Sequence, residues 1–297
     1  MTPRTAVPLA APRKAAHHAA ARPASPFRFF DAAVVRRRRL GPSIVRITFG
    51  GEQLGEFAGG GRDQSFSLFL PHPGQAEPVV PVELGDAWFA AWRAMDPAVR
   101  AVMRSYTVSE QRPEAGEVDV DFVLHGDTGP ATRWARDARP GARVRLLGPR
   151  TPENKSVCFR PPLDTDWVLL AADETALPAV AGILAWLPAG VRARAWIEVP
   201  RAEDVRPLPT AADVEIAWLV RDGLRRHGAV VDAVRAAALP EGSPYAWVAG
   251  ESGAVRALRR HLVTERGLGR ERVAFSGYWR LGASEEDLRA EALSGAA

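Results

Sequence analysis

The sequence predicts a two-domain protein in which an antiparallel β-barrel is followed by an α/β domain built on a parallel sheet. The chain has 297 residues with 46% apolar composition, and domains usually contain about 100–200 residues. Up to residue 150, short β-like runs are separated by turn residues, which is typical of a small antiparallel barrel. Beyond that point strand and helix patterns alternate, which indicates βαβ units.

The first 26 residues are rich in alanine, proline and arginine, and they lack the apolar segment of a secretory signal. We expect residues 1–26 to form a disordered tail. An arginine-rich, acid-poor segment is also typical of an organelle transit peptide, but its five prolines disfavour the amphipathic helix that such peptides form.

The predicted barrel domain spans residues 27–150. Its strands are short runs that alternate or stop at glycine or proline, namely Phe29–Arg39, Ile44–Phe49, Ser65–Leu70, Tyr106–Ser109, Val118–Leu124 and Arg143–Leu147. One helical piece, Ala87–Ala94, brings three aromatic side chains to one side and ends at Asp96-Pro97. We interpret that aromatic cluster as a packing surface rather than a ligand site.

The predicted α/β domain spans residues 164–297. Trp167–Ala172 is a continuous apolar run, which is typical of a strand buried on both faces. Further strands are expected at Arg192–Val199, Val214–Val220, Tyr245–Ala249 and Val273–Tyr278, and helices at Leu177–Leu187, Gly228–Ala238 and Glu251–Glu265. This order favours a nucleotide-binding α/β domain.

The composition disfavours several functional classes. The 39 basic residues exceed the 35 acidic ones by the four that lie in the first 26 residues, so the rest is balanced and no nucleic-acid partner is expected. The single cysteine, Cys158, excludes an internal disulfide, a cysteine-based zinc site and an iron–sulfur cluster, and it fits a reducing cytoplasm. No apolar run reaches the roughly 18 residues of a membrane span. We expect a cytoplasmic monomer with no metal site and no membrane insertion.

The run Arg104-Ser105-Tyr106-Thr107, which we expect to open a strand, places a cation, an aromatic ring and a hydroxyl within four residues. Alternate side chains of a strand point to one side, so the set suits a flavin. The arginine would pair with a phosphate, the tyrosine would stack on the ring system and the threonine would reach a ring nitrogen. Without further context, a strand edge with a solvated arginine is the simpler interpretation.

The run from His125 to Ala135 reads His-Gly-Asp-Thr-Gly-Pro-Ala-Thr-Arg-Trp-Ala and follows a predicted strand. A glycine-containing turn that leads into a helix, with Pro130 near the first helical position, leaves backbone N–H groups without partners. These groups suit a pyrophosphate, to which Thr132 can add a hydroxyl. An ordinary helix start capped by Thr128 is the alternative.

Together these segments resemble the siderophore-interacting proteins, a branch of the ferredoxin-reductase-like flavoproteins. That family carries Arg-x-Tyr-Thr and then His-Gly-x-x-Gly-Pro-Ala-x-x-Trp-Ala. The resemblance covers about Phe29 to Glu286 in order, and it continues through Asp173-Glu174-Thr175-Ala176-Leu177-Pro178-Ala179, Trp247-Val-Ala-Gly-Glu251 and Gly277-Tyr278-Trp279-Arg280.

The resemblance implies an FAD-binding barrel and a nicotinamide-nucleotide domain. Matching the motifs assigns FAD contacts to Arg104, Ser105, Tyr106, Thr107, His125, Gly129, Pro130, Ala131 and Thr132. It assigns nucleotide contacts to Asp173, Glu174, Thr175, Ala176, Gly250 and Glu251. The chain has no Gly-x-Gly-x-x-Gly in this domain, and in the family the segment that begins at Asp173 takes its place, with Thr175 expected to cap the following helix.

The resemblance also implies that NADH or NADPH reduces a ferric siderophore through FAD, which releases Fe(II). Hydride carries two electrons whereas Fe(III) accepts one, and a flavin can pass them on singly. The protein then needs only to orient the partners and to supply positive charge, for which we propose Arg280 beside Trp279, and Arg62. A solvated surface arginine is the simpler interpretation of Arg62 and an equal alternative for Arg280.

Two positions depart from the family pattern. Ser67 stands where a lysine is expected, and Thr151 stands where a glycine is usual, and both weaken the substrate assignment more than the cofactor assignment. Arg192, Arg194 and Arg201 lie around the second strand of the α/β domain and so allow NADPH. Two alternatives remain open: a flavin reductase with another acceptor, either a protein or free flavin, and a non-enzymatic protein that binds ferric chelates.

Overall fold

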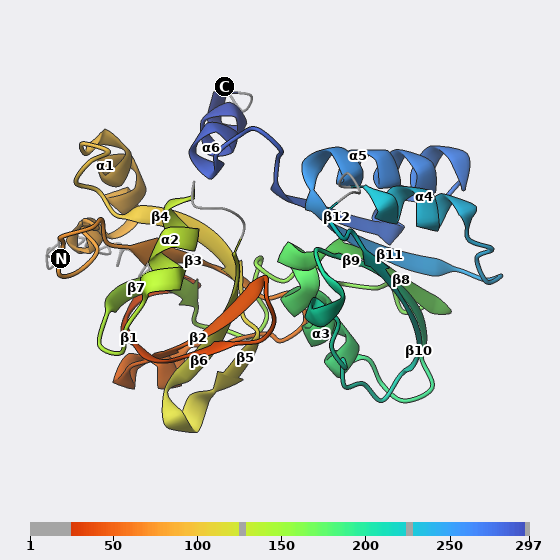
Figure 1. The fold of residues 1–297 in the computed structure, drawn as a ribbon, viewed down its shortest axis with the longest axis horizontal. Helices are drawn as coiled ribbons and strands as arrows, with labels where there is room; N and C mark the ends of the chain where they lie inside the picture. Colours follow the sequence, from red (N-terminus) through yellow and green to blue (C-terminus); the bar gives the residue numbers. More distant parts are fainter. Residues whose placement is uncertain (1–24, 125–128, 224–227, 295–297) are drawn as a thin grey trace, which may run out of the picture.

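The computed structural model describes residues 25–124, 129–223 and 228–294, so the predicted tail lies almost wholly outside the described residues. The chain forms two sheets side by side (Figure 1), a seven-stranded antiparallel sheet and a five-stranded parallel one. This arrangement confirms the predicted fold class. No helix among the described residues is long and apolar enough to cross a membrane.

The antiparallel sheet curves into a barrel with the strand order β4-β3-β7-β1-β2-β6-β5. Its strands are β1 (Phe27–Arg39), β2 (Ile44–Gly50), β3 (Ser65–Leu70), β4 (Val102–Thr107), β5 (Glu110–Arg112), β6 (Glu117–Val123) and β7 (Arg143–Pro149). The interior holds a cluster of fully buried side chains that includes Phe30, Ile47, Phe49, Val120, Phe122 and Leu146. The predicted strand Tyr106–Ser109 was placed too late, because β4 starts at Val102 and ends at Thr107. The Arg104–Thr107 motif therefore closes a strand rather than opening one.

The helix α1 (Trp88–Ala94) covers β3 and β4 with its aromatic side chains. Trp92 is buried, and the Trp88 ring lies 5.0 Å from Phe29 and 5.7 Å from Phe69. Edge contacts at these distances are favourable for aromatic pairs. The prediction that this cluster is a packing surface is confirmed.

The parallel sheet has the order β10-β9-β8-β11-β12. Its strands are β8 (Trp167–Asp173), β9 (Arg192–Val199), β10 (Asp213–Val220), β11 (Pro244–Glu251) and β12 (Val273–Trp279). The helix α3 (Leu177–Trp186) covers one face, and α4 (Ala229–Ala236) and α5 (Ser252–Arg260) cover the other (Figure 1). Every residue of β8 is buried, as its apolar run predicted.

The strand order reverses at the central strand β8, since β9 lies on one side of it and β11 on the other. In open parallel sheets, ligands bind beyond the carboxyl ends of the strands at such a point. Arg192 and Arg194 lie near the amino end of β9, in register with Trp167 and Leu169 of β8, and Arg194 pairs with Glu215. The expectation that Arg192 and Arg194 allow NADPH by meeting its 2′-phosphate is therefore wrong, because they lie at the opposite end of the strand. Arg201, the third arginine of that expectation, follows the carboxyl end of β9.

The two sheets are joined through buried polar contacts. Asp63, in the loop before β3, accepts hydrogen bonds from the backbone N–H groups of Cys158 and Phe159 and from Trp247 Nε1 on β11. Thr107 at the end of β4 lies beside Tyr278 on β12. A last helix, α6 (Glu285–Ser294), then returns to the barrel and lies beside β4 (Figure 1). These contacts bring the end of β4 and the end of β12 together.

Candidate functional site

The Arg104–Thr107 motif lies on β4, which is the edge strand of the barrel sheet and pairs with β3 alone among the named strands. Arg104 and Tyr106 point to one side because side chains alternate along a strand. The Tyr106 ring packs against Phe122 with centroids 4.4 Å apart, and burial raises the pKa of Tyr106 well above its ordinary value. Thr107 is buried. The motif thus places polar groups on an edge strand, and the packed Tyr106 ring and the buried Thr107 fix their positions.

The helix α2 (Pro130–Asp137) begins beside this edge and also contacts β6. Pro130 is its first residue, as predicted, and no side chain of the described residues caps its amino end. The hydroxyl of Thr132 points inward, 3.5 Å from the carbonyl oxygen of Val123. His125 and Thr128 lie outside the described residues. An amino end that no described side chain caps, with its positive partial charge, fits a phosphate group of FAD.

The polar groups of the motif hold two carboxylates from α6. Glu285 accepts hydrogen bonds from the backbone N–H of Ser105 at 3.1 Å and from its hydroxyl at 3.2 Å. The guanidinium of Arg104 donates to Glu286 at 2.5 Å. Burial raises the pKa of Glu285. Arg104 and Ser105 therefore form a working anion-binding set, which is what the fit to an FAD phosphate requires.

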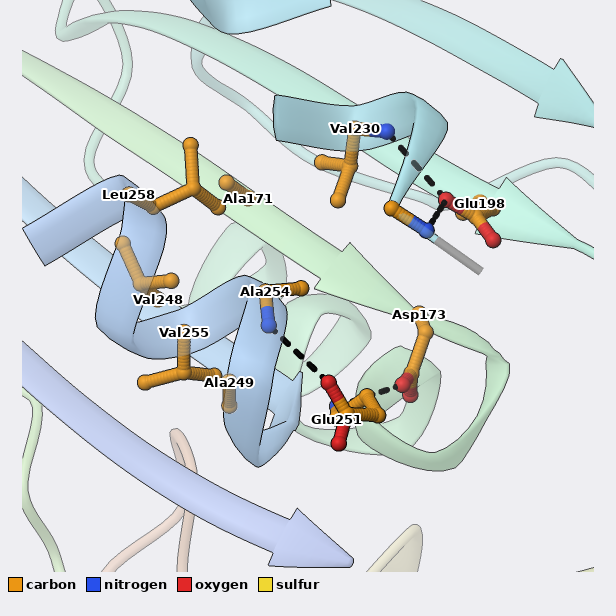
Figure 2. A pocket seen from close by; sticks show the side chains of 11 residues that line it. Ala171, Asp173, Glu198, Val230, Val248, Ala249, Glu251, Ala254, Val255 and Leu258 are labelled. Carbon is orange, nitrogen blue, oxygen red and sulfur yellow. Dashed lines mark hydrogen bonds between the residues drawn. The ribbon is translucent and has the colours of Figure 1, made fainter. Parts of the chain in front are cut away.

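The second group of predicted residues gathers at the carboxyl edge of the parallel sheet (Figure 2). Asp173 ends β8, and its Oδ1 accepts hydrogen bonds from the N–H and hydroxyl of Thr175. Its Oδ2 accepts from the N–H of Glu251 at 2.8 Å and from Trp279 Nε1 at 2.8 Å. Asp173 thereby ties the ends of β8, β11 and β12 together. The expectation that Thr175 caps α3 is wrong, because Asp173 holds that residue in a short turn before the helix.

Gly250 and Glu251 shape the same edge. Gly250 has φ 139°, and a Cβ there would lie 2.5 Å from the Asp173 carboxylate, so only glycine lets β11 approach β8 so closely. The carboxylate of Glu251 accepts from the N–H groups of Gly253 and Ala254 and so caps α5. The amino end of α5 is therefore neutralised within the protein rather than open to a phosphate.

A buried ion cluster lies next to Asp173. Arg221 at the end of β10 donates to both carboxylate oxygens of Glu174, at 2.8 and 2.5 Å, and to Glu198 at 3.0 Å. Glu198 in turn accepts from the N–H groups of Gly228 and Val230 at the start of α4. Glu198 and Arg221 were not predicted. The signal that could have shown Glu198 is an acidic residue near the carboxyl end of the predicted strand Arg192–Val199. The cluster thus joins the turn after β8, the end of β10 and the start of α4 at the carboxyl edge of the parallel sheet.

A small pocket opens between these groups, lined by Asp173, Glu198 and Glu251 and by apolar side chains of α4, α5 and β11 (Figure 2). Its enclosed space of about 10 Å³ holds roughly one water molecule. The predicted nucleotide residues therefore lie together. Four of them are buried, namely Asp173, Glu174, Ala176 and Gly250, and Thr175 and Glu251 are half-buried. A nucleotide at this edge would lie across the strand ends rather than inside the pocket.

The pKa of Asp173 gives a pH-dependent prediction. Burial and the neighbouring Glu174 carboxylate raise this pKa to about 6, from an ordinary value of 3.8. Between these two pH values the folded state binds the extra proton, so the Asp173 contribution to stability should fall as pH rises to 6 and then level off. We expect urea unfolding at pH 4 to 7 to show this decline in the wild type relative to Asp173→Asn. Parallel profiles for the two proteins would contradict it.

The predicted substrate residues have different surroundings. Arg62 has φ 55°, lies 5.3 Å over the Trp186 ring of α3 and is only 10% exposed in its side chain, so it is a packed interdomain residue. Trp279 is held by Asp173. Arg280 lies on the segment before α6 with its side chain 32% exposed, and it forms a bidentate pair with Glu291 at 2.7 and 2.6 Å. Of the two arginines, Arg280 is the one whose charge is presented to solvent.

Comparisons with known proteins agree with this geometry. Residues 33–153 match the model of the siderophore-interacting FAD-binding domain, and residues 165–282 match that of the siderophore-interacting protein. Ferric vibriobactin reductase ViuB of Vibrio cholerae is 30% identical over 256 residues, which cover 85% of this chain and 89% of that protein. Ferric acinetobactin reductase of Acinetobacter baumannii is 30% identical over 209 residues, which cover 66% and 71%. The crystal structure of the siderophore-interacting protein SipS from Aeromonas hydrophila has a TM-score of 0.73 at 30% identity and covers 90% of this chain and 98% of SipS.

Proposed function

We propose, since this chain belongs to the siderophore-interacting protein family, that it is an FAD-dependent reductase that takes electrons from NADH or NADPH and reduces ferric siderophores. The observation that carries the proposal is the anion-binding set of Arg104 and Ser105 on the edge of β4, next to α2, whose amino end no described side chain caps. A diphosphate needs such donors on two sides.

The residues of this chain would bind and orient the partners. Arg104, Ser105 and the first turn of α2 would hold the phosphates of FAD, and Thr107 at the end of this strand lies beside Tyr278 of the parallel sheet. Bound FAD would supply the exchange between a two-electron donor and a one-electron acceptor. Fe(II) prefers the hard oxygen ligands of a siderophore less than Fe(III) does, so reduction releases the iron. The proposal requires no acid or base from a side chain.

The nicotinamide donor would lie across the carboxyl ends of β8 and β11. Asp173 supports this surface from beneath, because it joins the ends of three strands and orients Trp279. The donor would therefore meet backbone groups and Trp279 more than the buried carboxylates of Asp173 and Glu174.

The test follows flavin absorbance under anaerobic conditions. Apoprotein is reconstituted with FAD, bleached with NADH or with NADPH in separate runs, and mixed with ferric siderophores while a chelator reports Fe(II). We expect bleaching by a nicotinamide and saturable, siderophore-dependent return of the yellow colour. Bleaching without reaction with any ferric chelate would favour a flavin reductase with another acceptor, and absence of FAD binding would favour a non-enzymatic binding protein.

Arg280 provides a prediction about the substrate. Replacing Arg280 with alanine should raise the apparent KM for an anionic ferric siderophore about two- to threefold at low ionic strength, because the pairing with Glu291 already offsets part of its charge. Flavin reduction by the nicotinamide should be unchanged in stopped-flow traces. Arg259→Ala serves as the control, because it removes an arginine that lies on α5 rather than on the segment after β12. Slower bleaching with unaltered siderophore kinetics would instead place Arg280 on the nicotinamide side.

A further inference from the structure

The C-terminal helix α6 places its first two carboxylates on the groups that we assign to the cofactor phosphate. We propose that α6 is an internal competitor of FAD, which holds Arg104 and Ser105 through Glu285 and Glu286 and must be displaced when FAD binds. The inference rests on the proposed function, because it takes Arg104 and Ser105 to be phosphate ligands.

The contacts show that one set of donors would have to serve two acceptors. β4 is an edge strand, and the outward N–H of Ser105 donates to Glu285 rather than to another strand. The hydroxyl of Ser105 donates to the same Glu285 oxygen, and Arg104 donates to Glu286 and lies 3.7 Å from Glu285. A backbone N–H has a single hydrogen. A phosphate oxygen bound at Ser105 therefore takes the place of Glu285.

The two carboxylates match a diphosphate in charge and in acceptor type. Glu285 and Glu286 present two negative charges and several oxygens to one guanidinium and one strand edge, which is what a diphosphate would present there. The contact joins distant parts of the chain, because about 180 residues separate the motif from α6.

The attachment of α6 is weak enough to be reversible. None of the side chains described on α6 is fully buried, so those side chains place little apolar surface against the barrel. Its other contacts are polar or partly exposed: Arg289 pairs with Glu285 and lies 5.7 Å from the Trp92 ring, and Glu291 pairs with Arg280. A ten-residue helix has little stability of its own, and partly exposed ion pairs contribute little each. FAD can therefore compete with α6 for its site.

FAD can bind only to molecules in which α6 is undocked. The apparent affinity for FAD is therefore the intrinsic affinity multiplied by the undocked fraction. The test compares two full-length variants that each remove one arginine-paired carboxylate from α6. Glu286→Gln removes the partner of Arg104, and Glu291→Gln removes the partner of Arg280 and leaves Arg104 untouched. Apoproteins are titrated with FAD and, separately, with riboflavin, which lacks phosphate, at physiological ionic strength.

We expect Glu286→Gln to bind FAD about three- to tenfold more tightly than the wild type and to leave riboflavin affinity unchanged. Glu291→Gln should tighten FAD binding by less than about twofold, because the partly exposed Glu291–Arg280 pair holds α6 only weakly, and it should leave riboflavin affinity unchanged. In the wild type, FAD should also speed hydrogen exchange of the α6 amides. Equal FAD affinity in both variants, weaker FAD binding by Glu286→Gln, tighter riboflavin binding, or greater protection of α6 by FAD would each overturn the proposal. Failure of every protein to bind FAD would instead refute the proposed function.

Discussion

Replacing Asp63 with alanine should lower the free energy of unfolding by about 3–5 kcal/mol. Asp63 is 4% exposed and accepts hydrogen bonds from the N–H groups of Cys158 and Phe159, at 3.1 and 3.0 Å, and from Trp247 Nε1 at 2.9 Å. The substitution leaves three donors without an acceptor, the buried Phe159 N–H and Trp247 Nε1 and the part-buried Cys158 N–H, and each buried one costs roughly 1–3 kcal/mol. Since one donor is on β11, the loss also loosens the barrel from the parallel sheet.

The measurement is urea unfolding of the FAD-free protein, with Asp31→Ala as the control. Asp31 is also paired, with Arg145 at 2.6 Å, but its side chain is 65% exposed, so its loss should cost under about 1 kcal/mol. Asp63→Asn should fall between the two, since one amide oxygen can still accept from part of the donor set. A change below 1 kcal/mol in Asp63→Ala would mean that the contacts of Asp63 contribute little to joining the two sheets.

The strands of the α/β domain were predictable because their signal is local. The apolar run at Trp167–Ala172 specifies a strand buried on both faces whatever its neighbours are, and β8 occupies Trp167–Asp173. The predicted helix Glu251–Glu265 is also confirmed in substance, as α5 followed by a π-helical turn at His261–Glu265. β5 was missed because three residues are too few to show a period, and its place is set by contacts with distant residues, through pairing with β6 and through hydrogen bonds of Gln111 with Phe57 and Gly59.

The candidate site was predicted less well, because its contacts join distant parts of the chain. The motifs located the right strand ends, but spacing alone does not show that Asp173, rather than Thr175, is the acceptor that organises the turn. The helix α6 was missed since its sequence, Glu285–Ser294, has few apolar residues and it is positioned by ion pairs with the barrel. Arg192 and Arg194 were misjudged although the predicted strand Arg192–Val199 already placed them at its amino end, because the ligand edge of a parallel sheet is formed by the carboxyl ends of its strands.

Arg104→Ala should weaken FAD binding by about ten- to a hundredfold. A charge-assisted hydrogen bond contributes roughly 1.5–3 kcal/mol, and every 1.4 kcal/mol changes a dissociation constant about tenfold. The side chain of Arg104 is 11% exposed, and it donates to the carbonyl of Met103 at 2.8 Å, which fixes its guanidinium at the β4 edge. A lysine could restore the charge but not the planar fork, so Arg104→Lys should recover only part of the affinity.

The measurement is fluorescence titration of the apoproteins with FAD and with riboflavin. Arg104→Ala should affect FAD alone, because riboflavin has no phosphate for the guanidinium to bind. Arg36→Ala is the matched control, since Arg36 also belongs to the barrel and forms a bidentate pair with Glu117 at 2.9 and 2.8 Å, away from the β4 edge. If both ligands bind more weakly to Arg104→Ala, the arginine supports the fold of β4. If FAD affinity is unchanged, the phosphate is held by α2 alone and the assignment of Arg104 is wrong.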